Sequence, residues 1–128
     1  MEKVVIRTEK APIPIAPYSQ AIKVGDVIYV SGFVAFDPHT GKVVEGGIKE
    51  QATQVMENIK AVLEAAGSSM KDVVKTTVYL TNLDDFKGMN EVFKTYFPTD
   101  PPARVTVGVK LPLPELLIEI DAIAYTRQ

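Results

Sequence analysis

The residues with the clearest capacity for chemistry lie near the end of the chain: one arginine, Arg104, and two carboxylates, Glu119 and Asp121. A guanidinium offers fixed planar donors that match a carboxylate, and a carboxylate can activate a water molecule as a general base. Glu119 and Asp121 alternate with isoleucines in a segment of strand character, so both project from one face. If residues 110–115 form a hairpin connection, Arg104 pairs within about two residues of these carboxylates. The result is either a cross-strand ion pair, which spacing alone favours, or a guanidinium at a subunit boundary that grips a substrate carboxylate.

Other catalytic chemistries have few residues to work with. The chain contains no cysteine, which removes thiol nucleophiles, disulfides and cysteine-ligated metals. Its single histidine, His39, lies within a turn signal, so neither a Ser-His-Asp triad nor a His-rich metal site is expected. No glycine-rich phosphate motif occurs, and Gly46–Gly47 is interpreted as a loop rather than as an anion cradle. We therefore expect no metal site.

The composition is that of a single globular domain spanning residues 1–128. The net charge of −2 and the pI near 5.4 supply no bulk attraction to phosphate, which argues against a general nucleic-acid partner. No run approaches the roughly 18 apolar residues that cross a bilayer, and residues 1–7 lack the apolar stretch of a signal peptide. We expect a cytoplasmic protein with no membrane partner.

The apolar periodicity predicts an α+β fold of about six strands and two helices. Strands are expected at residues 4–6, 19–24, 27–31, 73–80, 103–109 and 116–125. Helices are expected at residues 48–66, ended by Gly67, and from an N-cap at Asp84 to residue 97, ended by Pro98.

Two strand–helix–strand crossovers of the same hand place both helices on one face of the sheet. The last strand is nevertheless apolar on both faces, with Ile118 and Ile120 on one side and Leu117 and Ile123 on the other. A sheet with two apolar faces and helices for only one predicts an oligomer, or else loops that fold over the open face.

Seven segments between residues 11 and 125 carry recognisable motifs in a fixed order. They are APYSQAI at 16–22, VSG at 30–32, NIKAVLEAAG at 58–67, DVVKTTVYL at 72–80, Asp85-Phe86 with Asn90, PAR at 102–104 and IEIDAIA at 118–124. Together they resemble the Rid (reactive intermediate deaminase, RidA/YjgF-like) family. Each match alone is weak, whereas seven in register are specific.

The resemblance implies a chorismate-mutase-like fold, with a six-stranded mixed sheet and two helices on one face. It also implies a homotrimer in which the sheets form a barrel-like core, which would cover the open face. Three ligand clefts would then lie between neighbouring subunits.

The resemblance further implies an enzyme that hydrolyses 2-aminoacrylate-type enamines, through imino acids such as 2-iminobutanoate and 2-iminopropanoate, to 2-keto acids and ammonia. Arg104 would bind the substrate carboxylate, and Glu119 would orient or deprotonate the attacking water. The cleft would also be lined by Tyr18, Ser31, Gly32 and Asn90. No cofactor is implied, because an imine is already electrophilic. Each lining residue has a structural alternative: packing for Tyr18, a strand end for Ser31 and Gly32, and a solvated helix face for Asn90.

Two departures from the family pattern and two rival functions remain open. Thr106 stands where many members have cysteine, so thiol-based redox chemistry cannot carry over at that site. Phe33 stands where many members have glutamine, so the substrate range of the family does not carry over directly. One rival is a non-catalytic trimeric binder or sensor of small carboxylates such as 2-ketobutyrate. The other is an endoribonuclease or translation inhibitor, against which the acidic balance and the single histidine argue.

Overall fold

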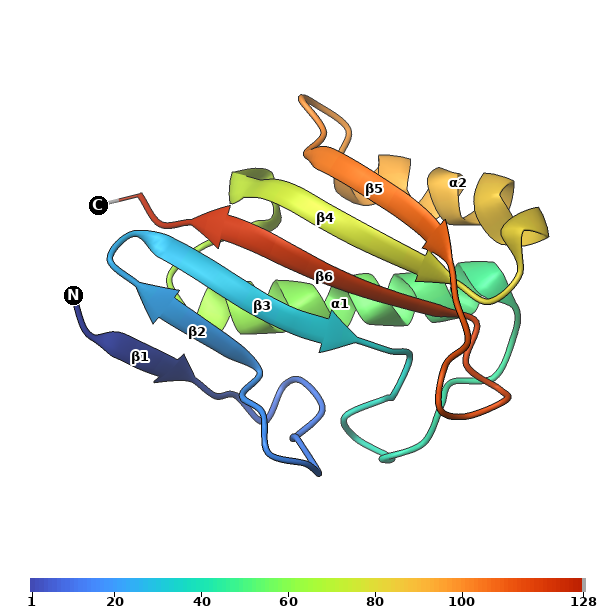
Figure 1. Cartoon of the computed structure of the whole chain (residues 1–128), viewed down its shortest axis with the longest axis horizontal. Helices are drawn as coiled ribbons and strands as arrows, with labels where there is room; N and C mark the ends of the chain where they lie inside the picture. Colours follow the sequence, from blue (N-terminus) through green and yellow to red (C-terminus); the bar gives the residue numbers. More distant parts are fainter. Residues whose placement is uncertain (128) are drawn as a thin grey trace.

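The alternating apolar residues form six strands, which the computed structural model joins into one sheet; it describes residues 1–127. The strands are β1 (Lys3–Ile6), β2 (Ala21–Val24), β3 (Val27–Phe33), β4 (Val73–Leu80), β5 (Ala103–Gly108) and β6 (Ile118–Tyr125). Their order across the sheet is β1-β2-β3-β6-β4-β5 (Figure 1). The β4–β5 pair is parallel and the other four pairs are antiparallel, so the sheet is mixed. The expected strand ends differ from these by at most two residues.

The longer helix, α1 (Ile48–Ala65), forms because its apolar residues recur at intervals of three and four. Its buried stripe packs on β3 and β6 and comprises Gln51, Ala52, Val55, Met56, Asn58, Ile59, Val62 and Leu63. Glu50 reaches back to accept a hydrogen bond of 2.8 Å from the Gly47 amide at the helix start. Gly67 ends the helix with φ +81°, a conformation that suits glycine.

The second helix, α2 (Phe86–Tyr96), begins later than the sequence suggested. The expected N-cap at Asp84 is wrong, because a single 3-10 turn occupies Leu83–Asp85 ahead of the helix. Asn82 initiates this turn, and its Oδ1 accepts a hydrogen bond of 2.9 Å from the Asp84 amide. Neither helix within residues 1–127 has the length and apolar content needed to cross a membrane.

The expected hairpin between the last two strands is also wrong. β4 lies between β5 and β6, so that Arg104 is paired with Thr76 rather than with a residue of β6. The difference follows from burial, because Ile118 and Ile120 are fully buried, and a strand this apolar belongs inside the sheet. β5 ends in a glycine and exposes Val105, which suits an edge strand.

Both helices lie behind the sheet in Figure 1, and no helix or strand of residues 1–127 covers the front. The expected placement of the helices on one face is therefore confirmed. The front face carries exposed apolar side chains, among them Val5, Val107 and Tyr29, which is 50% exposed. The alternative in which loops of the same chain cover this face is not what the structure shows.

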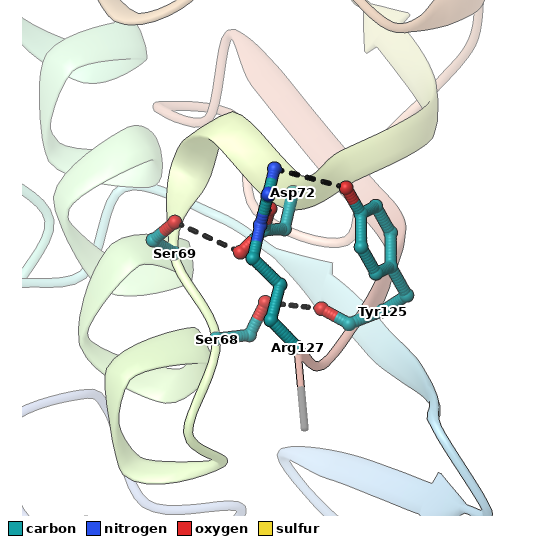
Figure 2. Close-up of polar contacts among 5 residues, drawn as sticks. All are labelled: Ser68, Ser69, Asp72, Tyr125 and Arg127. Carbon is teal, nitrogen blue, oxygen red and sulfur yellow. Dashed lines mark hydrogen bonds and ion pairs between the residues drawn. The ribbon is translucent and has the colours of Figure 1, made fainter.

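A polar cluster ties the end of β6 to the turn before β4 (Figure 2). The carboxylate of Asp72, only 3% exposed, accepts hydrogen bonds from Arg127 Nε at 2.7 Å and from Ser69 Oγ at 3.1 Å. Arg127 Nη2 also donates to the Tyr125 hydroxyl at 3.1 Å, and Ser68 Oγ donates to the Tyr125 carbonyl at 2.7 Å. Burial raises the pKa of Asp72, but the hydrogen bonds and the Arg127 charge outweigh it and leave the pKa below its ordinary value.

Candidate functional site

Arg104 extends from the edge strand β5 toward the helix layer. Its register partner Thr76 is buried on the side of β4 that faces the helices, and parallel neighbours in register point the same way. The side chain therefore meets α2 rather than the open face. Four α2 residues at intervals of three and four receive it: Phe86, Met89, Asn90 and Phe93.

The Arg104 guanidinium is held along one edge only. Its Nη1 donates to Asn90 Oδ1 at 2.7 Å and approaches Met89 Sδ at 3.9 Å. No acidic side chain among residues 1–127 pairs with it, and partial burial lowers its pKa without displacing the charge of an arginine. The Nε–H and Nη2 donors have no acceptor within the same residues. Two adjacent donors therefore remain available beside a shallow groove of about 290 Å³, lined by Asn90, Phe93, Lys94, Phe97, Pro101, Pro102 and Arg104.

Glu119 lies on β6 and faces the open side of the sheet, above Gly32 of β3. A Cβ at residue 32 would collide with Glu119 Oε2 and come within 2.8 Å of its Cδ, so only glycine leaves room for this carboxylate. Burial raises the pKa of Glu119, and the charge of Asp121 raises it further. No residue among 1–127 donates a hydrogen bond to the Glu119 carboxylate. A carboxylate with free oxygens and a raised pKa is chemically able to accept a proton from water.

The other carboxylate, Asp121, is already engaged. It accepts hydrogen bonds from the Thr77 amide at 3.2 Å and from the Tyr79 hydroxyl at 3.1 Å. Burial raises the pKa of Tyr79, and the Asp121 charge adds to the rise. Asp121 therefore acts in structure, by fixing β4 against β6, more directly than in chemistry.

A cleft of about 350 Å³ lies beside β3 and is lined by two of the three remaining predicted residues. Tyr18 and Gly32 line it, together with Pro12, Ile13, Ile15, Phe33, Val34, Phe36, Asp37, Pro38 and Gly41. Ser31 does not face this cleft with a free hydroxyl, because its Oγ donates to the Ser19 carbonyl at 2.6 Å. Ser31 instead fastens the Tyr18 segment to β3.

The wall of this cleft depends on Gln20, which the motif analysis did not single out. The Gln20 amide nitrogen donates to the carbonyls of Thr8 at 2.9 Å, Ala11 at 3.3 Å and Pro12 at 2.9 Å. Its oxygen accepts from the Thr8 amide at 2.7 Å. The role of Gln20 could have been inferred from the neighbouring proline-rich stretch, because its backbone carbonyl groups cannot pair within a β-sheet and need side-chain partners. Phe93, which also contacts Arg104, was not among the predicted site residues, and Phe86 entered only as part of a motif.

The predicted site residues thus form two separate groups within the chain. Arg104 and Asn90 lie on the helix side of β5, whereas Glu119, Gly32 and Tyr18 lie at the open side and the end of β3. Only β4 lies between β5 and β6, but Arg104 and Glu119 leave the sheet on opposite faces, and Glu119 is level with Val107, three residues along β5 from Arg104. Arg104 and Glu119 of one chain therefore do not face a common site, which corrects the proximity expected from the sequence.

Comparison with known proteins supplies the family. The family described as Endoribonuclease L-PSP matches residues 8–126. A RutC family protein of Pyrococcus abyssi is 59% identical, over 98% of this chain and 98% of its own length. The mouse 2-iminobutanoate/2-iminopropanoate deaminase is 47% identical, over 94% of this chain and 89% of its own length. A solved structure of E. coli TdcF with bound serine has a TM-score of 0.91 at 38% identity, covering 97% of this chain and 99% of that one. This chain belongs to the Endoribonuclease L-PSP family, to which the Rid motifs of its sequence had pointed.

Proposed function

We propose that this protein is a deaminase that hydrolyses reactive 2-imino acids, such as 2-iminobutanoate and 2-iminopropanoate, to 2-keto acids and ammonia. The observation that carries the proposal is the free Nε–Nη2 edge of Arg104, a half-buried cation with no acidic partner among residues 1–127. Such an edge matches the two oxygens of a carboxylate. The mouse relative bears the name of this activity, and the bound serine of TdcF carries the same carboxylate group.

We further propose that three copies of the chain assemble with the open sheet faces inward and form one cleft at each boundary. The separation of Arg104 from Glu119 supports this arrangement, because a cleft between copies can combine the β5 edge of one with the β3–β6 side of its neighbour. The exposed apolar side chains of the open face support it as well. Arg104 and Asn90 would come from one subunit, and Glu119, Gly32 and Tyr18 from the next.

In this cleft Arg104 binds the carboxylate with two hydrogen bonds and thereby fixes the position of the imine carbon. Glu119 accepts a proton from a water molecule while the water oxygen bonds to that carbon. Glu119 returns this proton to the nitrogen, which receives the electron pair of the carbon–nitrogen double bond, so that carbon now carries one hydroxyl and one amino group. Glu119 then transfers the hydroxyl proton to the amino nitrogen, the carbon–nitrogen single bond breaks, and ammonia leaves as the carbon–oxygen double bond forms. A carboxyl group with a raised pKa suits this two-way transfer. The Tyr18 ring covers the substrate.

The test couples a serine/threonine dehydratase to this protein and follows the decay of 2-aminoacrylate spectroscopically. Wild type should speed the decay, and Arg104→Lys should lower kcat/KM about 10- to 100-fold, because a single ammonium replaces two charge-assisted hydrogen bonds. Lys110→Met, which removes an exposed charge elsewhere, serves as the control. Equal decay with and without folded wild type would contradict the proposal.

A second function rests on the same arginine. A free guanidinium edge is sufficient to bind a small carboxylate without turning it over, as a sensor of 2-ketobutyrate would. Saturable binding of 2-ketobutyrate without any effect on 2-aminoacrylate decay would favour this function.

The endoribonuclease named in the family description is less well supported in this chain, since its net charge of −2 does not attract phosphate.

A further inference from the structure

The guanidinium of Arg104 has two aromatic neighbours from the same helix face. Its Cζ lies 5.6 Å from the ring centre of Phe86 and 4.8 Å from that of Phe93. Both distances fall within the range of about 6 Å in which a cation is attracted to an aromatic face. Phe86 and Phe93 are two helical turns apart and bracket Asn90, which holds Nη1.

The two rings differ in what the fold requires of them. Phe93 is 6% exposed and belongs to the core together with Met89, which is fully buried. Phe86 is 44% exposed at the first position of α2, so the core depends on it little. Its ring contact is with Arg104. An exposed aromatic at this position is therefore better explained by the arginine than by packing.

A single hydrogen bond does not fix the plane of a guanidinium. With only Asn90 Oδ1 as a strong acceptor, rotation about the side-chain torsions of Arg104 can still tilt the guanidinium plane and change the direction of its Nε–Nη2 edge. A ring near the guanidinium restricts this rotation, because the attraction is strongest over the ring face. If the Nε–Nη2 edge is already held in one orientation, less side-chain conformational entropy is lost when a ligand binds.

We propose that Phe86 is a positioning residue: it holds the Arg104 guanidinium in the plane that presents its free edge to the substrate carboxylate. The inference rests on the proposed function of Arg104 and adds to it a residue that never touches the substrate carboxylate. It also accounts for the presence of an apolar ring at an exposed helix start.

The experiment measures the dissociation constant of 2-ketobutyrate, as an unreactive carboxylate probe, by calorimetry on the full-length protein in its native assembly. Phe86→Leu keeps an apolar side chain and removes the ring, and should weaken binding roughly two- to five-fold, the range of a cation–π contact at an exposed site. Phe86→Tyr keeps the ring and should bind as wild type. Leu83→Ala, which trims a similarly exposed apolar side chain on the preceding turn, is the matched control.

A second readout separates positioning from a loss of stability. The 15Nε–H resonance of Arg104 should shift in Phe86→Leu and return in Phe86→Tyr, while thermal midpoints stay close to wild type. Unchanged affinity and resonance in Phe86→Leu would overturn the inference, provided that Arg104→Lys weakens binding. If Arg104→Lys binds the probe as wild type does, the proposed role of Arg104 fails instead.

Discussion

At the scale of single residues, the Glu119 carboxyl group packs directly against the backbone of Gly32 on the open side of the sheet. The Glu119 carboxyl occupies the space that a side chain at position 32 would need. This contact limits the directions in which the carboxylate can point, and the limit comes from the backbone of a different strand. The position of a water molecule bound by Glu119 would therefore be restricted as well.

We predict that Gly32→Ala lowers kcat for 2-aminoacrylate about 10- to 100-fold, because the added methyl displaces the Glu119 carboxylate from its position. The displaced group is the end of a flexible side chain, so the thermal midpoint should change little. Gly108→Ala is the control, since a Cβ there meets Leu83 at an ordinary 3.5 Å. Wild-type kinetics in Gly32→Ala would show that the Glu119 position is not needed.

The raised pKa of Glu119 predicts the acid side of the pH profile. Activity that needs the ionised base should fall as pH drops through this raised pKa, at a pH above the ~4.3 of a free glutamate. Glu119→Gln should remove that limb.

Since the native state holds the Glu119 proton more tightly than the unfolded chain, ionised Glu119 destabilises the fold above the unfolded pKa. Chemical denaturation should therefore show Glu119→Gln to be more stable than wild type at pH 7 but not at pH 3.

At the scale of elements, the cluster around Asp72 fastens the end of β6 to the start of β4, two neighbouring strands inside the sheet (Figure 2). We predict that Arg127→Met lowers the thermal midpoint by several degrees at pH 7, because it removes the charged partner of the buried Asp72 carboxylate. Arg7→Met removes an exposed arginine without an ion pair among residues 1–127 and should have little effect.

The pH dependence of this loss follows from the lowered pKa of Asp72. The stabilisation is present above the pKa of an unfolded aspartate, ~3.9, and is lost as pH falls through the lower folded pKa. The difference between wild type and Arg127→Met should therefore shrink toward pH 2. A difference that stays constant from pH 7 to pH 2 would mean that Arg127 acts through packing and not through its charge.

The bounds of helices and strands could be predicted from the sequence, whereas the order of the strands in the sheet could not. The bounds of β4 and nearly those of α1 follow from apolar periodicity, because neighbours along the chain decide them. The insertion of β6 between β3 and β4 does not, since pairing between distant strands leaves no local pattern. For the same reason the sequence placed Arg104 near Glu119. The motif nevertheless named Asn90, whose contact with Arg104 the structure shows.

At the scale of the whole molecule, the proposed clefts need two copies of the chain, and a mixing experiment tests this. Arg104→Ala and Glu119→Gln should each be inactive alone. If the two groups meet only across a boundary, trimers re-formed from an equal mixture contain about one cleft in four with both native residues and should recover activity in that proportion. Light scattering on wild type should report three copies. No recovery from co-refolded mixtures would contradict a shared cleft.

The four hydrogen bonds of Gln20 have a consequence for how fast the cleft can fill. They fix Thr8, Ala11 and Pro12, the stretch of chain that leads into the cleft wall at Pro12 and Ile13 and that is further stiffened by Pro14 and Pro17. Because the wall is already fixed in this way, it does not need to rearrange around the ligand. Binding should therefore occur in one kinetic step. Association of 2-ketobutyrate should then rise in proportion to its concentration without reaching a plateau, and short-lived imines would be intercepted at the rate at which they collide with the cleft.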